Sequence, residues 1–179
     1  MLNGERVVLR PIERADLPRL LELRSDAELE RLVWGAPYPH TLEELEAAFD
    51  RNAEKAPPDR DAVEFGIDVD GTLIGRITMF FFDRVGQTCR MGISIERSMT
   101  GKGYGRDAIA TLVRYAFEDL NLHRISIDTL ATNEAAMHAF AACGFVEEGR
   151  LRQHYWYRGR YVDAVDMGIL RSEWLAEKA

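Results

Sequence analysis

The stretch that decides the fold is ISIERSMTGKGYGRDAIATLVRYAF, residues 93–117. It passes from a short apolar segment, through a turn with three glycines at alternate positions, into an amphipathic helix. Glycine allows the backbone to turn its N–H groups inward, and the first amides of a helix have no partner within the helix. The helix dipole also favours negative charge at that end. The segment therefore predicts an anion site in which backbone amides bind phosphate oxygens.

The charges around this turn agree with an anion site. Arg97, Lys102 and Arg106 lie in a run without Asp or Glu, which gives a local charge of +3 in a chain of net charge −7. The alternative is an ordinary strand-to-helix turn with solvated basic side chains. The run 103–108 also matches the dinucleotide pattern G-x-G-x-x-A, but a hairpin and helices precede it instead of a regular βαβ series. No Walker A motif fits the chain.

Outward from the turn, the sequence predicts strands and helices that share one sheet. The expected strands are 7–9, 63–69, 73–82, 88–95, 124–130, 149–157 and 160–170. Asp16 and Asn133 are expected to cap helices, and 41–44 predicts a capping box for a helix that ends near residue 54. Asp-Gly at 70–71 and Arg-Gly at 158–159 predict turns between paired strands. The expected fold class is therefore α/β (α+β), with a single domain over residues 1–179.

Composition narrows the classes of function. The chain has 179 residues, 46% hydrophobic and 30% charged, which is typical of a globular domain with a sizeable core. Its net charge of −7 argues against general binding to nucleic acid or to an anionic membrane. Two cysteines make no disulfide framework and lack metal-ligand spacing, so no metal is expected. Without an apolar signal sequence or membrane-length run, a cytoplasmic protein is expected.

The order of these elements resembles the GNAT superfamily of acetyl-CoA-dependent N-acetyltransferases. The matching stretches are the turn 100–105, ATNEAA at 131–136, and CGF at 143–145 with Gly149. The opening VVLRP at 7–11 and the closing stretch 166–174 are similar to the Rim-type branch, which includes ribosomal-protein and polyamine acetyltransferases. The resemblance covers essentially the whole chain. It implies a mixed, mostly antiparallel sheet, splayed between the fourth and fifth strands (88–95 and 124–130) and flanked by about four helices.

The resemblance also implies acetyl-CoA as the acyl donor. Its pyrophosphate would lie on the turn formed by Thr100, Gly101, Lys102, Gly103, Tyr104, Gly105 and Arg106. Thr100 stands where the family usually has Arg or Gln, which is tolerable because the backbone donors matter more than that side chain. The backbone of Ile93, Ser94 and Ile95 would run beside the pantetheine arm. Asn133, and Phe140 on the same helix, would contact the arm from the other side of the splay.

Acetyl transfer sets chemical requirements that the sequence meets only in part. A free alkylammonium has a pKa of about 10.4, so the acceptor amine must lose a proton before it attacks. The thioester oxygen needs a hydrogen-bond donor, which the backbone amide of Ile95 could supply. Glu96, at the strand end, is the candidate base; the alternative is a solvated charge. Proximity can supply much of the remaining barrier, so dedicated acid–base residues are optional.

The usual proton donors and acceptors of the family are absent from this chain. Phe140 stands at the position of a Tyr acid, Ala136 at that of a Ser, and Arg90 at that of a Glu. His138, Tyr155 and Tyr157 are expected on the surface or in a wall of the site. These departures leave open a non-catalytic CoA-binding or sensory module. An acyltransferase with another donor, such as succinyl-CoA, or with a hydroxyl acceptor also stays open.

The acceptor side is indicated by analogy and by charge. Trp34 and Tyr38, with His40, lie in the predicted loop between the first two helices and are expected to wall the acceptor site; packing of Trp34 at the core edge is the alternative. Residues 13–54 hold 11 acidic and 5 basic side chains, a net charge of −6, although solvated helix faces would explain these acids too. The expected acceptor is a small-molecule or peptide amine. A homodimer is expected only by analogy with relatives.

Overall fold

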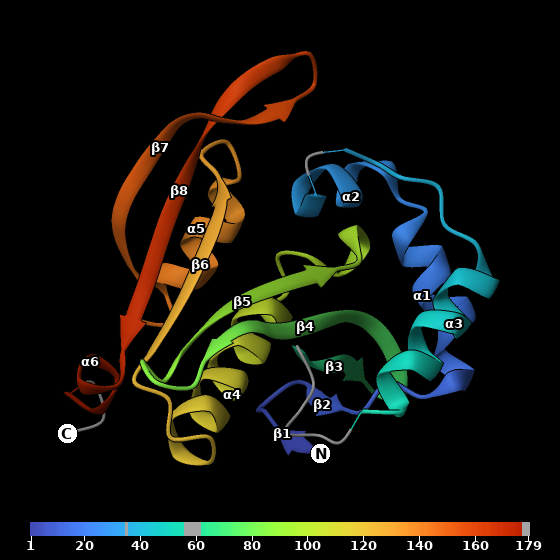
Figure 1. Ribbon diagram of the computed structural model, residues 1–179, viewed down its shortest axis with the longest axis horizontal. Helices are drawn as coiled ribbons and strands as arrows, with labels where there is room; N and C mark the ends of the chain where they lie inside the picture. Colours follow the sequence, from blue (N-terminus) through green and yellow to red (C-terminus); the bar gives the residue numbers. More distant parts are fainter. Residues whose placement is uncertain (35, 56–61, 177–179) are drawn as a thin grey trace.

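Eight strands form one open sheet in the computed structural model, which describes residues 1–34, 36–55 and 62–176 (Figure 1). The strands are β1 (Leu2–Asn3), β2 (Val8–Arg10), β3 (Ala62–Val69), β4 (Thr72–Asp83), β5 (Thr88–Ile95), β6 (Arg124–Leu130), β7 (Val146–Tyr157) and β8 (Arg160–Leu170). Their order is β1-β2-β3-β4-β5-β6-β8-β7. Every neighbouring pair is antiparallel except β5 and β6, which run parallel. The predicted mixed, mostly antiparallel sheet is confirmed.

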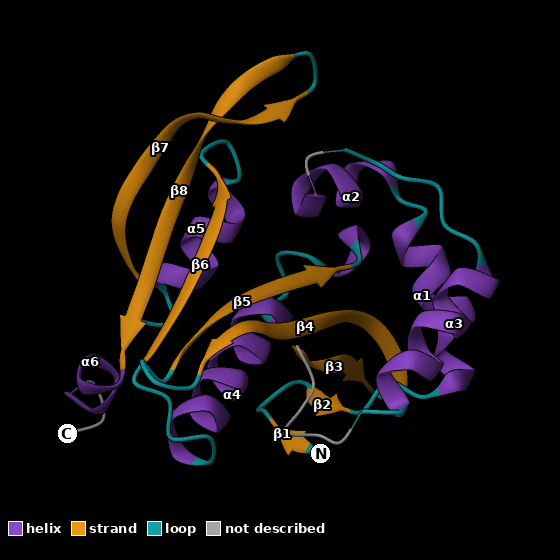
Figure 2. Cartoon of the chain, in the orientation of Figure 1, coloured by secondary structure: helices purple, strands orange, loops and turns teal. Residues whose placement is uncertain are grey.

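Helices cover both faces of this sheet (Figure 2). They are α1 (Leu17–Arg24), α2 (Ala27–Trp34), α3 (Leu42–Ala53), α4 (Tyr104–Glu118), α5 (Glu134–Ala141) and α6 (Arg171–Ala176), with short 3-10 turns at 14–16 and 97–99. α4 packs against one face of the sheet, beside α5. α1 and α3 pack together on the other face, near β4, and α2 contacts β5 and β6. A ligand between β5 and β6 would therefore have α2 on one face of the sheet and α4 and α5 on the other.

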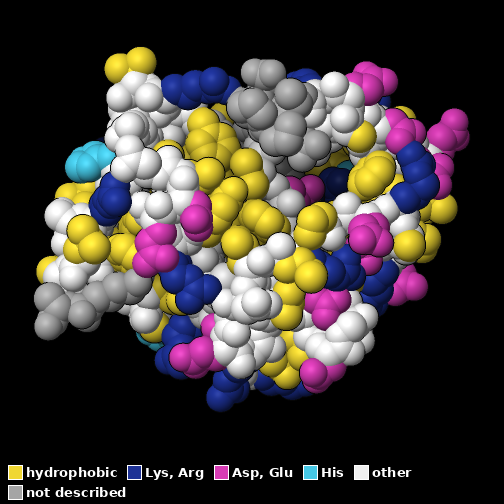
Figure 3. Space-filling model, turned by 90° about the horizontal axis from the view of Figure 1, so that it is seen from below, with side chains coloured by type: hydrophobic (Ala, Val, Ile, Leu, Met, Phe, Trp, Pro, Cys, Tyr) yellow, Lys and Arg dark blue, Asp and Glu magenta, His cyan; other side chains and the backbone are white. Residues whose placement is uncertain are grey.

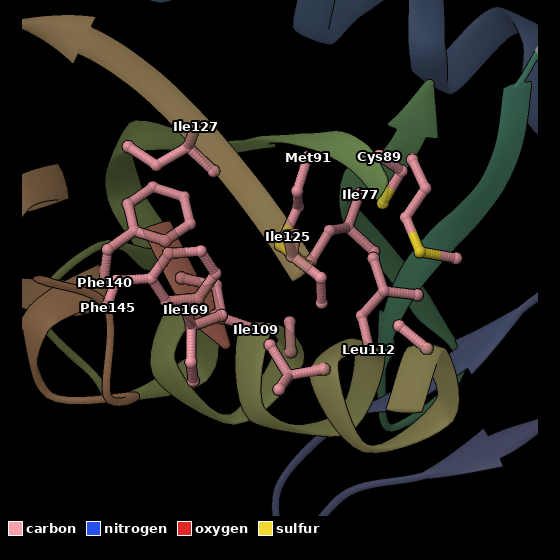
Figure 4. Packing of buried hydrophobic residues seen from close by; sticks show 14 of the residues in the cluster. Ile77, Cys89, Met91, Ile109, Leu112, Ile125, Ile127, Phe140, Phe145 and Ile169 are labelled. Atoms are coloured by element: carbon pink, nitrogen blue, oxygen red, sulfur yellow. The ribbon is translucent and has the colours of Figure 1, made fainter. Parts of the chain in front are cut away.

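The main core lies between the sheet and α4. Figure 4 shows Ile109 and Leu112 of α4 directed at Ile77, Cys89 and Met91 of the sheet, and all five side chains are buried. Complete burial of a Leu or Ile side chain stabilises a fold by about 1.5–3 kcal/mol. These contacts fix α4 on the sheet and so fix the position of its N-terminal end. A smaller cluster joins α1 and α3 to β4: Leu17, Leu20, Leu23, Leu45 and Leu73.

Local sequence signals account for most of the element boundaries. The capping box is confirmed, because the Thr41 hydroxyl accepts the N–H of Glu44 at 3.2 Å and the Glu44 carboxylate accepts the N–H of Thr41 at 3.0 Å. The 70–71 and 158–159 turns both have two consecutive residues with positive φ, as tight hairpin turns require. Asp16 precedes α1, but its carboxylate accepts hydrogen bonds from the Arg10 guanidinium and the Glu13 N–H instead of capping the helix. Asp16 is therefore the N-cap residue of α1 as expected, but the expected side-chain cap is absent.

Two helices were not predicted. α2 occupies part of the segment expected to be a loop, and the Asp26 carboxylate accepts the N–H groups of Glu28 and Leu29 at its start. α6 follows β8 directly at the end of the described chain. β7 also begins earlier than predicted, at Val146 rather than Gly149. Its pairing with β8 shifts in register between Glu147 and Gly149, so the first residues of the strand pair irregularly.

Candidate active site

The turn before α4 has the geometry of an anion site. Gly101 and Gly103 have φ values of 74° and 85°, and Gly103 is the N-cap residue of α4. The Asp107 N–H bonds to the Gly103 carbonyl at 3.1 Å. The amides of Tyr104, Gly105 and Arg106 therefore precede the first helical hydrogen bond and belong to the open end of the helix. These donors, with Lys102 beside them, can receive a pyrophosphate.

Two residues that the sequence did not single out hold this turn in place. The Asp107 carboxylate accepts the backbone N–H groups of Glu5, Arg6 and Val7 at 3.0, 2.7 and 2.9 Å, which ties α4 to the segment between β1 and β2. The Arg6 guanidinium then donates to the Lys102 carbonyl at 3.0 Å. Both contacts join residues about 100 positions apart in the chain, so no local pattern could have indicated them.

The splay is confirmed by the pairing of β5 with β6. The two strands pair only at Thr88–Arg124, Cys89–Ile125 and Arg90–Ser126. Beyond Arg90 they separate, as Figure 1 shows, while β5 stays paired with β4 as far as Ile95. The space between β5 and β6 is therefore a wedge, closed at Arg90 and open toward the glycine turn.

The backbone of β5 divides its hydrogen-bonding groups between β4 and this wedge. The Glu96 N–H donates to the Ile74 carbonyl of the β4 side at 2.8 Å. Because N–H groups alternate along an antiparallel strand, those of Ser94 and Gly92 also face β4. Those of Ile93 and Ile95 face the opposite way, into the wedge. Of the predicted strand residues, Ile93 and Ile95 can offer backbone groups to a ligand there, whereas Ser94 is directed at β4.

The residues expected from the far side of the splay lie on α5. Asn133 is the predicted N-cap, since its side-chain oxygen accepts the Ala136 N–H at 3.2 Å. Its side-chain NH2 group takes no part in that bond. Phe140 is only 4% exposed, and its ring packs edge-on against Phe145 with ring centroids 5.2 Å apart. Phe140 therefore belongs mainly to the core.

Glu96 lies beyond the end of β5, against α1. Its carboxylate pairs with the Arg19 guanidinium and accepts the Ser98 hydroxyl at 2.6 Å. The hydrogen bond from Ser98 and the positive charge of Arg19 lower the pKa of Glu96 below its ordinary value.

On the acceptor side, Tyr38 is exposed and lines a hollow of about 350 Å³. The other lining residues are Arg24, Ser25, Pro37, Pro39 and His40. The His40 ring lies 3.4 Å from the buried Glu30 carboxylate of α2. Trp34 ends α2, but its side chain lies outside the described part of the structure.

A polar network that the sequence did not predict lies where β5 and β6 separate. Arg90 forms an ion pair with Asp128 of β6, and the same guanidinium nitrogen lies 3.6 Å from Asp166 of β8. The Tyr155 hydroxyl, from β7, donates to the second oxygen of Asp128. Tyr155 is half-buried in this network, while His138 is exposed on α5. Four strands contribute to this network, so only the folded sheet brings its members together.

The described residues include neither a membrane-spanning helix nor a candidate metal site. Within residues 1–34, 36–55 and 62–176, no helix is both long and apolar enough to cross a membrane. Among the same residues, no group of three or more His, Cys, Asp or Glu side chains is arranged to hold a metal ion.

The sequence of this chain matches a family model described as an acetyltransferase (GNAT) domain over residues 6–146. The chain belongs to the GNAT acetyltransferase family. It is 31% identical over 172 residues to the spermidine N(1)-acetyltransferase of Vibrio cholerae, with 96% of this chain and 97% of the relative aligned. It is 30% identical over 177 residues to the putative ribosomal N-acetyltransferase YdaF of Bacillus subtilis, covering 98% of this chain and 97% of the relative.

A solved GNAT structure agrees with the fold. The Vibrio cholerae spermidine N-acetyltransferase in complex with CoA and spermine superposes with a TM-score of 0.87 at 29% identity, covering 96% of this chain and 99% of the other. The predicted fold class and the predicted relationship to polyamine and ribosomal acetyltransferases are confirmed. The chain is an acetyltransferase that acts on amines, with acetyl-CoA as donor.

Proposed function

We propose that this acetyltransferase moves the acetyl group to a primary amine by direct attack within a ternary complex. The observation that carries the proposal is that β5, whose edge toward β6 is unpaired beyond Arg90, leads directly into the glycine turn before α4. The pyrophosphate of acetyl-CoA would bind the amides of the turn, with Lys102 and Arg106 nearby. The pantetheine arm would then run along β5 into the wedge, where the backbone groups of Ile93 and Ile95 face it.

The length of the arm sets where the thioester lies. Pantetheine is about as long as four extended residues, or roughly 14 Å. The six positions from Glu96 back to Arg90 span about 20 Å of strand. An arm that begins level with Glu96 would bring the thioester to the closed half of the wedge, and we therefore propose the amide of Ile93, with that of Ile95 as the alternative, as the donor to the thioester oxygen. A fixed amide at that position stabilises the charge that develops on the oxygen.

The role of Glu96 as proton acceptor stays a prediction. If Glu96 is the base, Glu96→Gln lowers kcat/KM at neutral pH. The reduction in kcat/KM relative to wild type is smaller at high pH, where more of the amine is already neutral. A variant with the rate and pH profile of the wild type would remove Glu96 from the mechanism.

The acceptor classes that we propose are polyamines and polypeptide N-termini. The similarity to a spermidine and a putative ribosomal acetyltransferase supports both classes. The negative charge of the 13–54 segment discriminates only weakly between acceptors, because its acids pair with neighbouring arginines. Among these pairs are Asp50 with Arg14 and Glu22 with Arg19. Acidic and basic side chains are also interspersed on the face shown in Figure 3. We further propose that residues 1–179 act as one cytoplasmic domain that can form a homodimer.

Thiol release from acetyl-CoA, measured with a panel of amines, tests this function. The panel contains spermidine, a short peptide with a free N-terminus and no lysine, and the same peptide already acetylated as a control. We expect release with at least one free amine and none with the blocked peptide. Binding of acetyl-CoA in calorimetry without release would support a CoA-binding module, and release from succinyl-CoA alone would support a different donor. No binding at millimolar acetyl-CoA would overturn the assignment of the turn.

A further inference from the structure

Asp128 lies where β5 and β6 begin to separate. The paired part of the two strands ends at Arg90–Ser126, and Asp128 is two residues further along β6. Successive side chains of a strand alternate between faces, and Ile125 and Ile127 point into the core. Asp128 therefore points to the other face, the same face as Arg90, where α2 contacts both strands.

The surroundings of Asp128 leave an excess of negative charge. Asp166 is its direct cross-strand partner on β8, and like charges in such a pair repel. A single guanidinium, that of Arg90, contacts both carboxylates. One cation against two anions favours a second cation, such as an ammonium.

The same surroundings hold the carboxylate in place. The Asp128 side chain is 23% exposed, and its two oxygens are bound separately by Arg90 and by the Tyr155 hydroxyl. A hollow of about 240 Å³ opens at two other members of this network, Arg90 and Asp166; its remaining lining residues are Arg124, Ser126, Glu148 and Gly149, and Asp128 does not line it. The hairpin that carries Tyr155 is in turn tied to α2 by the ion pair of Arg158 with Glu28.

We propose that Asp128 binds the ammonium of the acceptor and takes the proton that it must lose, with Arg90 and Tyr155 as positioning residues. This rests on the proposed path of the pantetheine arm, which ends in the closed half of the wedge. An N–H bond of the ammonium breaks and its proton goes to a carboxylate oxygen of Asp128. The nitrogen lone pair forms a bond to the thioester carbon, and the C–S bond breaks. The departing thiolate takes the proton from Asp128, and the new amide nitrogen loses its second proton to water.

The test compares two acceptors that differ in protonation. An ordinary alkylamine is almost wholly protonated at neutral pH, whereas trifluoroethylamine is largely neutral. We expect Asp128→Asn to lower kcat/KM for the alkylamine by about 100-fold or more, the usual range for loss of a general base. The loss with trifluoroethylamine should be at least tenfold smaller, and KM for acetyl-CoA should not change. Equal losses with the two acceptors, or no loss with the alkylamine, would overturn the proposal.

A matched control separates this role from the loss of an ion pair. Glu64 of β3 accepts hydrogen bonds from the Arg76 guanidinium at 2.8 Å and from the Thr78 hydroxyl at 3.3 Å. Its partner set thus imitates that of Asp128, two strands away from the wedge. We expect Glu64→Gln to leave both acceptors' kcat/KM within about twofold of wild type. A protonation-dependent loss in Glu64→Gln as large as that in Asp128→Asn would overturn the proposal as well.

Two further variants keep the test decisive if Asp128→Asn does not fold. Asp128→Glu keeps the carboxylate and should retain more alkylamine activity than any neutral replacement. Tyr155→Phe keeps Asp128 but removes one hydrogen bond, and should lower alkylamine turnover more than trifluoroethylamine turnover. Equal effects on the two acceptors in both variants would refute the role of Asp128. Failure of the wild type to bind acetyl-CoA would instead refute the proposed function. If Glu96→Gln shows the larger loss with the alkylamine and Asp128→Asn does not, the base is Glu96 and not Asp128.

Discussion

Replacement of Gly103 by alanine tests whether the shape of the glycine turn is what binds acetyl-CoA. Gly103 has φ 85°, in the left-handed region that disfavours any residue with a Cβ by about 1–2 kcal/mol. The added Cβ would lie 3.5 Å from the Arg6 guanidinium, which is an ordinary contact, so the strain is conformational and not steric. If the turn relaxes to relieve this strain, its amides leave their positions. Since about 1.4 kcal/mol is a tenfold change in a binding constant, the Kd for CoA should rise up to about tenfold.

Calorimetry with CoA, together with thermal unfolding, measures how this strain divides between affinity and stability. Gly71 provides the control, because it has φ 82° in the turn between β3 and β4 and nothing within 4 Å of an added Cβ. Gly71→Ala should destabilise the fold by a similar amount and leave the Kd for CoA unchanged. Weaker CoA binding in Gly71→Ala, or unchanged binding in a destabilised Gly103→Ala, would refute the reasoning that this turn is the phosphate site.

Three other predictions concern the core and the ends of the sheet. Because Ser98 and Arg19 lower the pKa of Glu96, its carboxylate should stabilise the fold at pH values above about 4.3, the range of a free glutamate, and lose that contribution as the pH falls through the lowered pKa. Urea unfolding of wild type and Glu96→Gln should therefore differ at neutral pH and converge in acid; a constant difference would contradict this. Burial raises the pKa of the Cys89 thiol to about 12, so iodoacetamide should modify it only after unfolding, and fast labelling of the native protein at Cys89 would show that the core opens. Leu112→Ala, at a side chain with 0% exposure, should lower the free energy of unfolding by about 2–5 kcal/mol, and a loss below 1 kcal/mol in urea would mean that α4 is not packed as described.

The fold could be predicted where the signals were local. Thr41 with Glu44, Asn133, and the 70–71 turn each depend on residues a few positions apart, and all three have the predicted geometry. α2 was missed because its start depends on Asp26, which was not recognised as a cap. The side-chain cap expected of Asp16 is missing because Arg10, six positions earlier in the chain, binds its carboxylate.

The candidate site likewise has one part that the sequence predicts and one part that only the fold brings together. The glycine turn and β5 lie in one continuous stretch, so the amides that can bind phosphate were visible in the sequence. The resemblance to a known family supplied what the stretch alone could not, namely the donor and the splay. Asp128, Arg90, Tyr155 and Asp166 come from four strands and meet only through the sheet order β5-β6-β8-β7. No spacing in the sequence predicts such a meeting.

Direct attack in a ternary complex is the central claim, and initial rates test it most directly. Rates are measured over a grid of acetyl-CoA and amine concentrations, and the intact mass of the enzyme is recorded after incubation with acetyl-CoA alone. The account predicts double-reciprocal lines that intersect, and an unmodified enzyme mass, because the amine attacks the bound thioester itself. Parallel lines together with an enzyme one acetyl group heavier would contradict it, since they would show that the acetyl group passes through the protein.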